Sequence, residues 1–181
     1  MRPWRCALLG ATGLGLAAAL GACSSESETV TCPRSAIMPD LQAVVRFKPG
    51  AGRADTDAAY GVRLLTVPMA CHFEKKDKSL DIAGKLGISA IRTDTLTKDA
   101  QVDYFVAIVN RSDTIIGKRE FTLDLKWSGD QRRIEITDEL HLVIPLAAGT
   151  SGADYAILLG FQLTPEELEY NRAHLKLPGS G

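Results

Sequence analysis

The chain has few residues from which a catalytic or metal-binding site could be built. Its 181 residues include three histidines and four cysteines, and the histidines show neither His-x-His nor His-Glu-x-x-His spacing. Because a zinc site needs three or four converging ligands, we expect no metal site from His72, His141 and His174. Gly-x-Ser-x-Gly and Walker sequences are also absent. We therefore expect no catalytic residues and no cofactor.

Aromatic residues, excess basic charge and long apolar runs are scarce as well. Aromatic residues make up 6% of the chain, and the net charge is −1. A carbohydrate-binding face built from several aromatic rings is not indicated, and no basic patch suggests a nucleic acid partner. The apolar run 8–20 is shorter than the roughly 20 residues that a membrane-spanning helix needs.

That run has instead the form of a secretory signal, because Arg2 and Arg5 precede it and small residues follow it. The sequence at 20–23 reads Leu-Gly-Ala-Cys and resembles the lipobox of bacterial lipoproteins. The resemblance implies removal of residues 1–22, a diacylglyceryl thioether on Cys23 and an acylated amine. Two alternatives are an uncleaved N-terminal anchor and cleavage by ordinary signal peptidase.

The residue after the lipidated cysteine carries sorting information in bacterial lipoproteins. An Asp at that position favours the inner membrane, whereas this chain has Ser24. We therefore expect a lipid-anchored protein of the cell envelope, on the periplasmic face of the outer membrane.

Removal of residues 1–22, which contain two arginines and no acidic residue, leaves 159 residues and changes the net charge from −1 to −3. Cys32 and Cys71 are then the cysteines left without a role, and two such thiols in an oxidising compartment usually pair. We predict a Cys32–Cys71 disulfide that closes a loop of about 40 residues and contributes about 4 kcal/mol. The alternative is free or redox-active thiols, although no Cys-x-x-Cys is present.

Residues 23–31 are polar, acidic and without periodicity, which is typical of a flexible tether. Eight such residues reach about 16 Å on average, so the folded part is expected to stay close to its membrane. After the tether, the dominant hydrophobic period is two, which indicates β-strands. The strand-like runs are 43–47, 60–73 with Pro68 inside it, 80–91, 102–109, 121–127, 134–144 and 155–163.

These runs are separated by turn residues, and no helical segment lies between them. The pattern predicts a mainly β domain of about seven antiparallel strands in a two-sheet sandwich, either immunoglobulin-like or fibronectin type III-like. Tyr155 follows a Gly/Asp corner and could form a tyrosine corner, or it is an ordinary core residue. Pro68 interrupts one run, so we expect a bend or bulge there. Trp127 shares its parity with Leu125 and is expected in the core.

One helix is predicted from Pro165 to about His174. Thr164 and Glu167 form a capping box, and proline suits the first helical position. We expect this short helix to dock on the sandwich through Leu168 and Tyr170. The domain would then span residues 32–174, with a disordered tail at 175–181.

Several stretches resemble an uncharacterised family of bacterial cell-envelope lipoproteins. They are Cys32-Pro33 leading to 46–50, the triplet 138–140, and 152–155 through 160–172. The resemblance implies a lipoprotein with one β-rich domain and implies no activity.

The resulting hypothesis is a non-enzymatic lipoprotein that serves in protein–protein interaction or envelope assembly. Its partners are the membrane, through the lipid anchor, and an unknown envelope protein. The polar face of the helix is the suggested interaction surface, with Glu166, Glu169 and Arg172 as its residues, although a simply solvated face would look the same. A carrier of lipid or of a small ligand between the sheets is the alternative, and a hydrolase with an unrecognised site is a third.

Overall fold

Alternating apolar and polar residues extend through most of the folded chain and form nine strands in the computed structural model, which describes residues 31–174. The strands are β1 (Arg34–Ile37), β2 (Ala43–Phe47), β3 (Ala58–Leu64), β4 (Met69–Glu74), β5 (Ser79–Arg92), β6 (Asp99–Asn110), β7 (Ile115–Lys126), β8 (Arg133–Pro145) and β9 (Tyr155–Phe161). Three 3₁₀ turns and one α-helix accompany them: η1 (Pro39–Leu41), η2 (Asp55–Asp57), η3 (Gly152–Asp154) and α1 (Pro165–His174).

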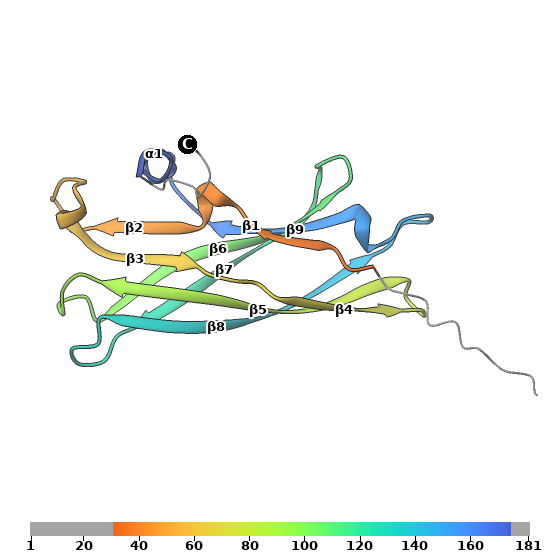
Figure 1. Ribbon diagram of the computed structural model, residues 1–181, viewed down its shortest axis with the longest axis horizontal. Helices are drawn as coiled ribbons and strands as arrows, with labels where there is room; N and C mark the ends of the chain where they lie inside the picture. The colour runs from red at the N-terminus through yellow and green to blue at the C-terminus, as the bar shows by residue number, and fades with distance from the viewer. Residues whose placement is uncertain (1–30, 175–181) are drawn as a thin grey trace, which may run out of the picture.

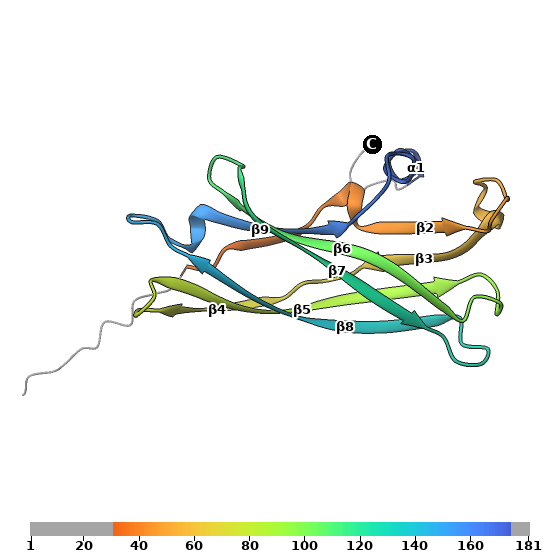
Figure 2. The ribbon, with the colours of Figure 1, turned by 180° about the vertical axis from the view of Figure 1, so that it is seen from behind.

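The strands form two sheets that face each other (Figures 1 and 2). One, here called the β6 sheet, has the order β1-β9-β6-β7, in which β1 runs parallel to β9. In the other, the β5 sheet, β3 and β4 pair in succession with one edge of β5, while β8 pairs with the opposite edge. Strand β2 extends this sheet beyond β3. The predicted two-sheet sandwich with a short C-terminal helix is therefore confirmed.

The predicted count of about seven strands was wrong, for two physical reasons. Strand β1 has four residues and is too short to show a period, and its hydrogen bonds come from β9, far away in the chain. Strands β3 and β4 lie along the same edge of β5 but are separate, because Pro68 cannot donate to the ladder. The backbone still bridges this gap through Leu65 N–H to Gly87 O (2.8 Å) and Lys85 N–H to Pro68 O (3.1 Å).

The central strands pair as they do in an immunoglobulin-like sandwich. The pair β5–β8 corresponds to the B–E neighbours of that architecture, and the pair β6–β9 corresponds to its C–F neighbours. Strand β7 pairs with the other edge of β6. Tyr155 begins β9 directly after the crossing from β8, and its hydroxyl accepts from Ala147 N–H at 3.5 Å. This arrangement is a tyrosine corner. Strand β1 differs from the usual immunoglobulin-like arrangement. It pairs with β9 in parallel, at the position where a C-terminal antiparallel strand is usual.

Side chains of both sheets fill the space between them. The largest fully buried apolar residues include Ile82, Leu86, Leu125 and Leu159, and Trp127 is buried as predicted. Arg92 is 1% exposed at one end of β5, and its guanidinium donates to backbone carbonyl groups of Thr97 (2.7 Å), Thr95 (3.3 Å) and Gly129. Arg92 thus ties the β5–β6 and β7–β8 loops together.

Helix α1 has the predicted bounds and cap. Thr164 N–H donates to Glu167 Oε2 (2.9 Å), and Glu167 N–H donates to Thr164 Oγ1 (3.3 Å). The helix lies over η1 and β2 (Figure 1). Within residues 31–174, no helix has both the length and the apolar character needed to cross a membrane.

Candidate functional site

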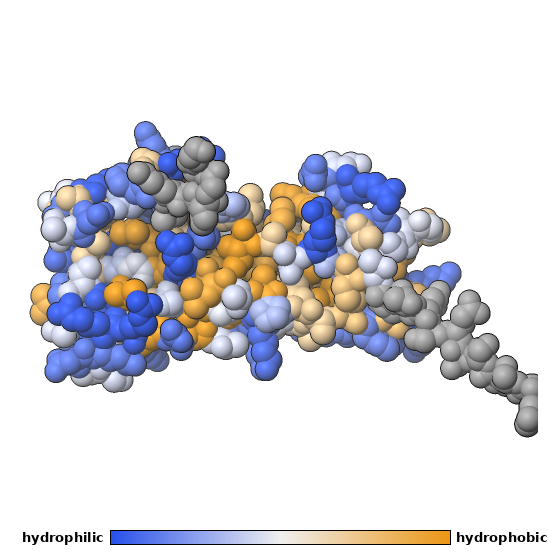
Figure 3. Space-filling view, viewed as in Figure 1, coloured by the Kyte–Doolittle hydropathy of each residue, from blue (hydrophilic) through white to orange (hydrophobic). Residues whose placement is uncertain are grey.

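The outward face of the β5 sheet carries exposed apolar side chains. Leu65 is 47% exposed, Ile91 40% and Val143 52%, and their strand parity is opposite to that of the core residues. The outward positions between them on β4 and β5 hold small residues, among them Ala70, Ala83 and Gly87. Figure 3 shows the apolar side chains gathered along the middle of this face, over β3 and β5.

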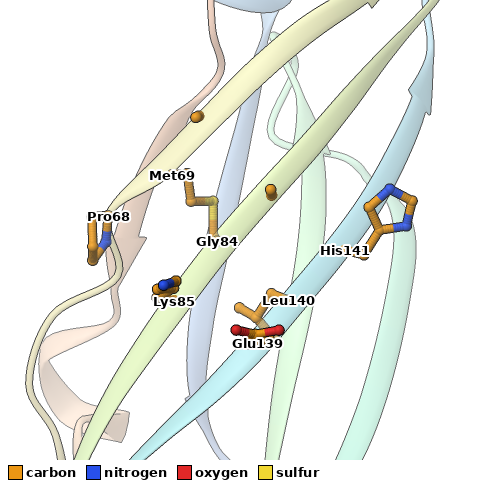
Figure 4. A pocket seen from close by; sticks show the side chains of 9 residues that line it. Pro68, Met69, Gly84, Lys85, Glu139, Leu140 and His141 are labelled. Carbon is orange, nitrogen blue, oxygen red and sulfur yellow. The ribbon is translucent and has the colours of Figure 1, made fainter.

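A hollow of about 750 Å³ lies on this face where β4, β5 and β8 run side by side (Figure 4). Gly84 borders it only through its backbone, because this residue shares the inward parity of Ile82 and Leu86, and a side chain there would point to the core and come within 3.1 Å of Met69 Cγ. The missing side chain leaves the room that Met69 occupies. The hollow is lined by small, apolar and charged residues: Pro68, Met69, Ala70, Ala83, Gly84, Lys85, Glu139, Leu140 and His141.

Charged and polar residues border the hollow. Lys85 and Glu139 face each other as register partners of β5 and β8. His141 Nε2 lies 2.8 Å from Asp81 Oδ1. An apolar centre surrounded by polar groups is the general anatomy of a protein interface.

The structure gives no further support to a metal or catalytic site. No group of three or more His, Cys, Asp or Glu side chains within residues 31–174 could hold a metal ion. His72 and His141 lie on β4 and β8 with β5 between them, and each has a carboxylate neighbour, Glu74 at 3.4 Å and Asp81 at 2.8 Å respectively.

The predicted interaction residues of α1 lie in different surroundings. Arg172 Nε is 3.0 Å from Asp40 Oδ2, so this side chain forms an exposed ion pair with η1. Glu166 and Glu169 are exposed and border a hollow of about 470 Å³ together with Arg53 and Tyr170. Hydrogen bonds from its own backbone N–H and from the Thr164 hydroxyl lower the pKa of Glu166 below its ordinary value.

The residue that docks the helix is Asn171, which the sequence analysis missed. It is 1% exposed, and its Nδ2 donates to Asp40 O (2.9 Å) and Ala43 O (2.8 Å). Of the two predicted docking residues, Tyr170 packs edge-to-face on Phe47 with ring centroids 5.3 Å apart, whereas Leu168 is half-buried. An asparagine in a polar helix gives no sequence signal of burial.

A second polar group that the sequence did not reveal lies in the core. Tyr104 on β6 is fully buried, and its hydroxyl donates to Asp138 Oδ2 at 2.7 Å. Burial and this hydrogen bond raise the pKa of Tyr104 well above its ordinary value. Asp138 is on β8, an outer strand of its sheet, and an inward-pointing charge on an edge strand discourages pairing with another chain.

Cys32 and Cys71 form the predicted disulfide, with their Cα atoms 5.7 Å apart. The predicted lipidation site Cys23, the signal 1–22 and the tail 175–181 lie outside the described residues.

Comparison with known proteins places the chain in no family. No protein-family model matches it, and no curated protein matches it. Among solved structures, it is similar to the variable (V) domain of the AgI/II polypeptide BspA of Streptococcus agalactiae, with 8% identity over 71% of this chain and 77% of that domain and a TM-score of 0.18. At this TM-score the similarity carries no argument about fold or function.

Proposed function

We propose that the protein is a lipid-anchored, non-enzymatic binding module of the bacterial cell envelope, which docks another envelope protein on the outward face of its β5 sheet. Leu65, Ile91 and Val143 are exposed on that one face. Apolar side chains exposed on the same face of a domain can mark a surface that binds a partner. The exposed face around the hollow is the observation that carries the proposal.

The chemistry of the face favours a protein partner with a flat apolar surface. Ala70, Ala83 and Gly87 project little, so a partner can approach the strands closely. His141, at the border of the hollow, has a partner within the molecule, Asp81. A partner would gain apolar contact over the hollow, and the polar border would set its orientation.

The proposed anchor limits where the partner can be. A lipid on Cys23 and a tether of eight residues before Cys32 keep the sandwich near its membrane. Ser24 supports the outer membrane as that location. Partners fixed in or near the same membrane are then favoured, because the anchor raises their effective concentration.

The carrier hypothesis receives less support from the geometry. The core cluster draws residues from both sheets, for example Ile82 and Ile144 from one and Val106 and Leu159 from the other. The 750 Å³ hollow lies on the outside of the β5 sheet (Figure 4). A lipid bound between the sheets would have to displace these packed side chains.

Site-specific photocrosslinking in cells tests the proposed docking face. A photoreactive phenylalanine at position 83 should form a discrete adduct with one envelope protein, whereas the same group at Thr122, exposed on the outward face of the β6 sheet, should not. Because a bulky charge would block the hollow, Ala70→Arg should abolish that adduct. Ala36→Arg, at an exposed alanine on β1, is the matched control and should leave it intact.

Equal adducts at positions 83 and 122, or an adduct that survives Ala70→Arg in a folded protein, would contradict the docking face. Thermal unfolding of both arginine variants verifies that they are folded. Fatty-acid labelling that persists in a Cys23→Ser variant would separately contradict the anchor. A stoichiometric lipid in the native mass spectrum would support the carrier hypothesis instead.

A further inference from the structure

One end of the sandwich brings together the start of the described chain and two hairpin loops. The carbonyl of Thr31 lies against Gly152 in η3, where a side chain could not be accommodated. The disulfide joins Cys32 to Cys71 on β4. Leu146 N–H donates to Lys78 O at 2.9 Å, which joins the β8–β9 loop to the β4–β5 hairpin. Both loops lie at the right-hand end of Figure 1 and at the left-hand end of Figure 2.

The β4–β5 hairpin is rich in lysine at this end. Its turn reads Lys75-Lys76-Asp77-Lys78, and all four residues are exposed. Lys78 adopts a left-handed conformation with φ of 48°, which turns the chain tightly between the strands. Including Glu74, the five residues have a net charge of +1, in a mature chain of net charge −3.

The neighbouring β8–β9 loop does not oppose this positive charge. Residues 146–153 contain no acidic side chain, and Ala147 and Ala148 are exposed. The next acidic residue, Asp154, is largely buried and ion-paired with Arg111 of the β6–β7 turn. The end from which the tether leaves is therefore a basic hairpin beside a small, uncharged loop.

Chain length determines how close this end lies to the proposed anchor. Eight residues separate Cys23 from Cys32, so even a fully extended tether spans about 30 Å. Its average reach is about half that distance. The disulfide keeps the chain beside β4, so the exit cannot move away from the hairpin.

We propose that this end of the sandwich rests on anionic phospholipid headgroups, which the hairpin residues Lys75, Lys76 and Lys78 contact. The inference relies on the lipid anchor of the proposed function. The tether carries Glu26 and Glu28, so attraction to an anionic surface has to come from the folded end. Contact at this end directs the β5 sheet along the membrane normal and leaves its outward face open to a partner.

The expected effect is moderate and sensitive to salt. Each lysine close to an anionic membrane contributes about a fivefold gain in association, and the attraction declines beyond about 10 Å at ordinary ionic strength. Acyl chains supply the main attachment, so the lysines determine the orientation of the domain.

Lysine acetylation of the full lipoprotein, reconstituted in vesicles, tests the inference. The vesicles are made of phosphatidylcholine with or without phosphatidylglycerol, and the rate at each lysine is measured by mass spectrometry. Lys75, Lys76 and Lys78 should react several-fold more slowly on the anionic vesicles, and high salt should reverse the difference. Lys98, in the β5–β6 loop at the opposite end, should react at the same rate on both.

A charge-reversal pair provides the matched control. Lys75→Glu with Lys76→Glu should remove the protection of Lys78, whereas Lys98→Glu with Lys126→Glu should leave it unchanged. Protection that persists in the first variant overturns the inference. Slow acetylation of the hairpin lysines in the absence of vesicles also overturns the inference, because their protection would then come from ion pairs with Glu26 and Glu28 of the tether.

Flotation of the same samples separates failure of the inference from failure of the anchor. A protein that floats with both vesicle types but shows equal rates at the hairpin overturns only the lipid contact. Flotation with anionic vesicles alone supports the lipid contact and contradicts the acyl anchor. Flotation with neither type overturns both.

Discussion

Tyr104 and Asp138 form a polar contact inside an otherwise apolar core. Tyr104 is buried among strands of the β6 sheet, whereas Asp138 belongs to β8 and is half-buried. The 2.7 Å hydrogen bond between them connects the two sheets. Asp138 accepts this hydrogen bond on β8, an outer strand of its sheet.

Tyr104→Phe should lower the free energy of unfolding by about 1–2 kcal/mol, because Asp138 loses a buried donor. Urea denaturation measures this change. Phe73→Leu, in which one apolar side chain at a half-buried position replaces another, controls for general loss of packing. No loss in the Tyr104 variant would mean that the hydrogen bond contributes nothing net.

Ionisation of Tyr104 should also weaken the protein at high pH. The folded-state pKa is raised above the unfolded value of about 10, so the contribution of the hydrogen bond is fully present below pH 10 and is lost as pH rises towards the folded pKa. The free energy of unfolding, measured by urea denaturation between about pH 8 and about pH 11, should fall more steeply with pH for the natural chain than for Tyr104→Phe. Parallel curves would contradict this assignment.

At the scale of the element, α1 is held by one buried amide more than by its charges. The side-chain amide of Asn171 donates hydrogen bonds to the backbone carbonyl groups of Asp40 and Ala43, where the chain enters β2. Arg172 and Asp40 form an exposed pair, and such pairs usually contribute little. Glu167 also pairs with Arg46, but Asn171 is the buried residue of α1, so its amide is expected to contribute most.

Asn171→Ala should therefore destabilise the docked helix by about 2–3 kcal/mol, because the carbonyls of Asp40 and Ala43 lose their donor. Limited proteolysis within α1, together with urea denaturation, measures the effect. Arg172→Ala is the matched control next to it and should cost less than about 1 kcal/mol. Equal losses in the two variants would show that charge holds the helix.

On the scale of the whole molecule, the disulfide connects the tether exit to the β5 sheet. It joins residues 39 apart in sequence and crosses from the start of the fold to β4. Without it, the segment leading into β1 would be held by that four-residue strand alone. The bridge therefore contributes to stability and keeps the proposed anchor at one end of the sandwich.

Replacing both cysteines, as Cys32→Ser with Cys71→Ser, should lower the free energy of unfolding by up to about 4 kcal/mol, because the unfolded chain regains the freedom of a closed loop. Urea denaturation with and without reductant measures this loss. A reductant should weaken the natural protein to a similar extent and should leave the double variant unchanged. Equal stability of oxidised and reduced protein would contradict a structural role.

Local patterns were sufficient to predict much of the fold. Apolar residues at every second position over 121–127 and 134–144 predicted strands with the correct inward faces, and Trp127 is buried as its parity requires. The capping residues Thr164 and Glu167 marked the start of α1. These features depend on interactions between residues that are close in sequence, so they can be predicted from short segments of the chain.

The candidate site could not be predicted in the same way. The hollow combines residues 68–70, 83–85 and 139–141, which meet only because β4 and β8 pair with opposite edges of β5. Neither the parallel pairing of β1 with β9 nor the buried amide of Asn171 has a local signature.

The amino-acid sequence alone determined the expected leader and lipid site, the strand periodicity, the pairing of the two remaining cysteines and the capped helix. Each follows from side-chain chemistry at short separations or from a simple count of thiols. Tertiary structure decided which strands became neighbours, which face stayed open, and which end carries both the tether and the lysine hairpin. These features depend on contacts between segments distant in the chain, whose free energy exists only after the sheets have packed.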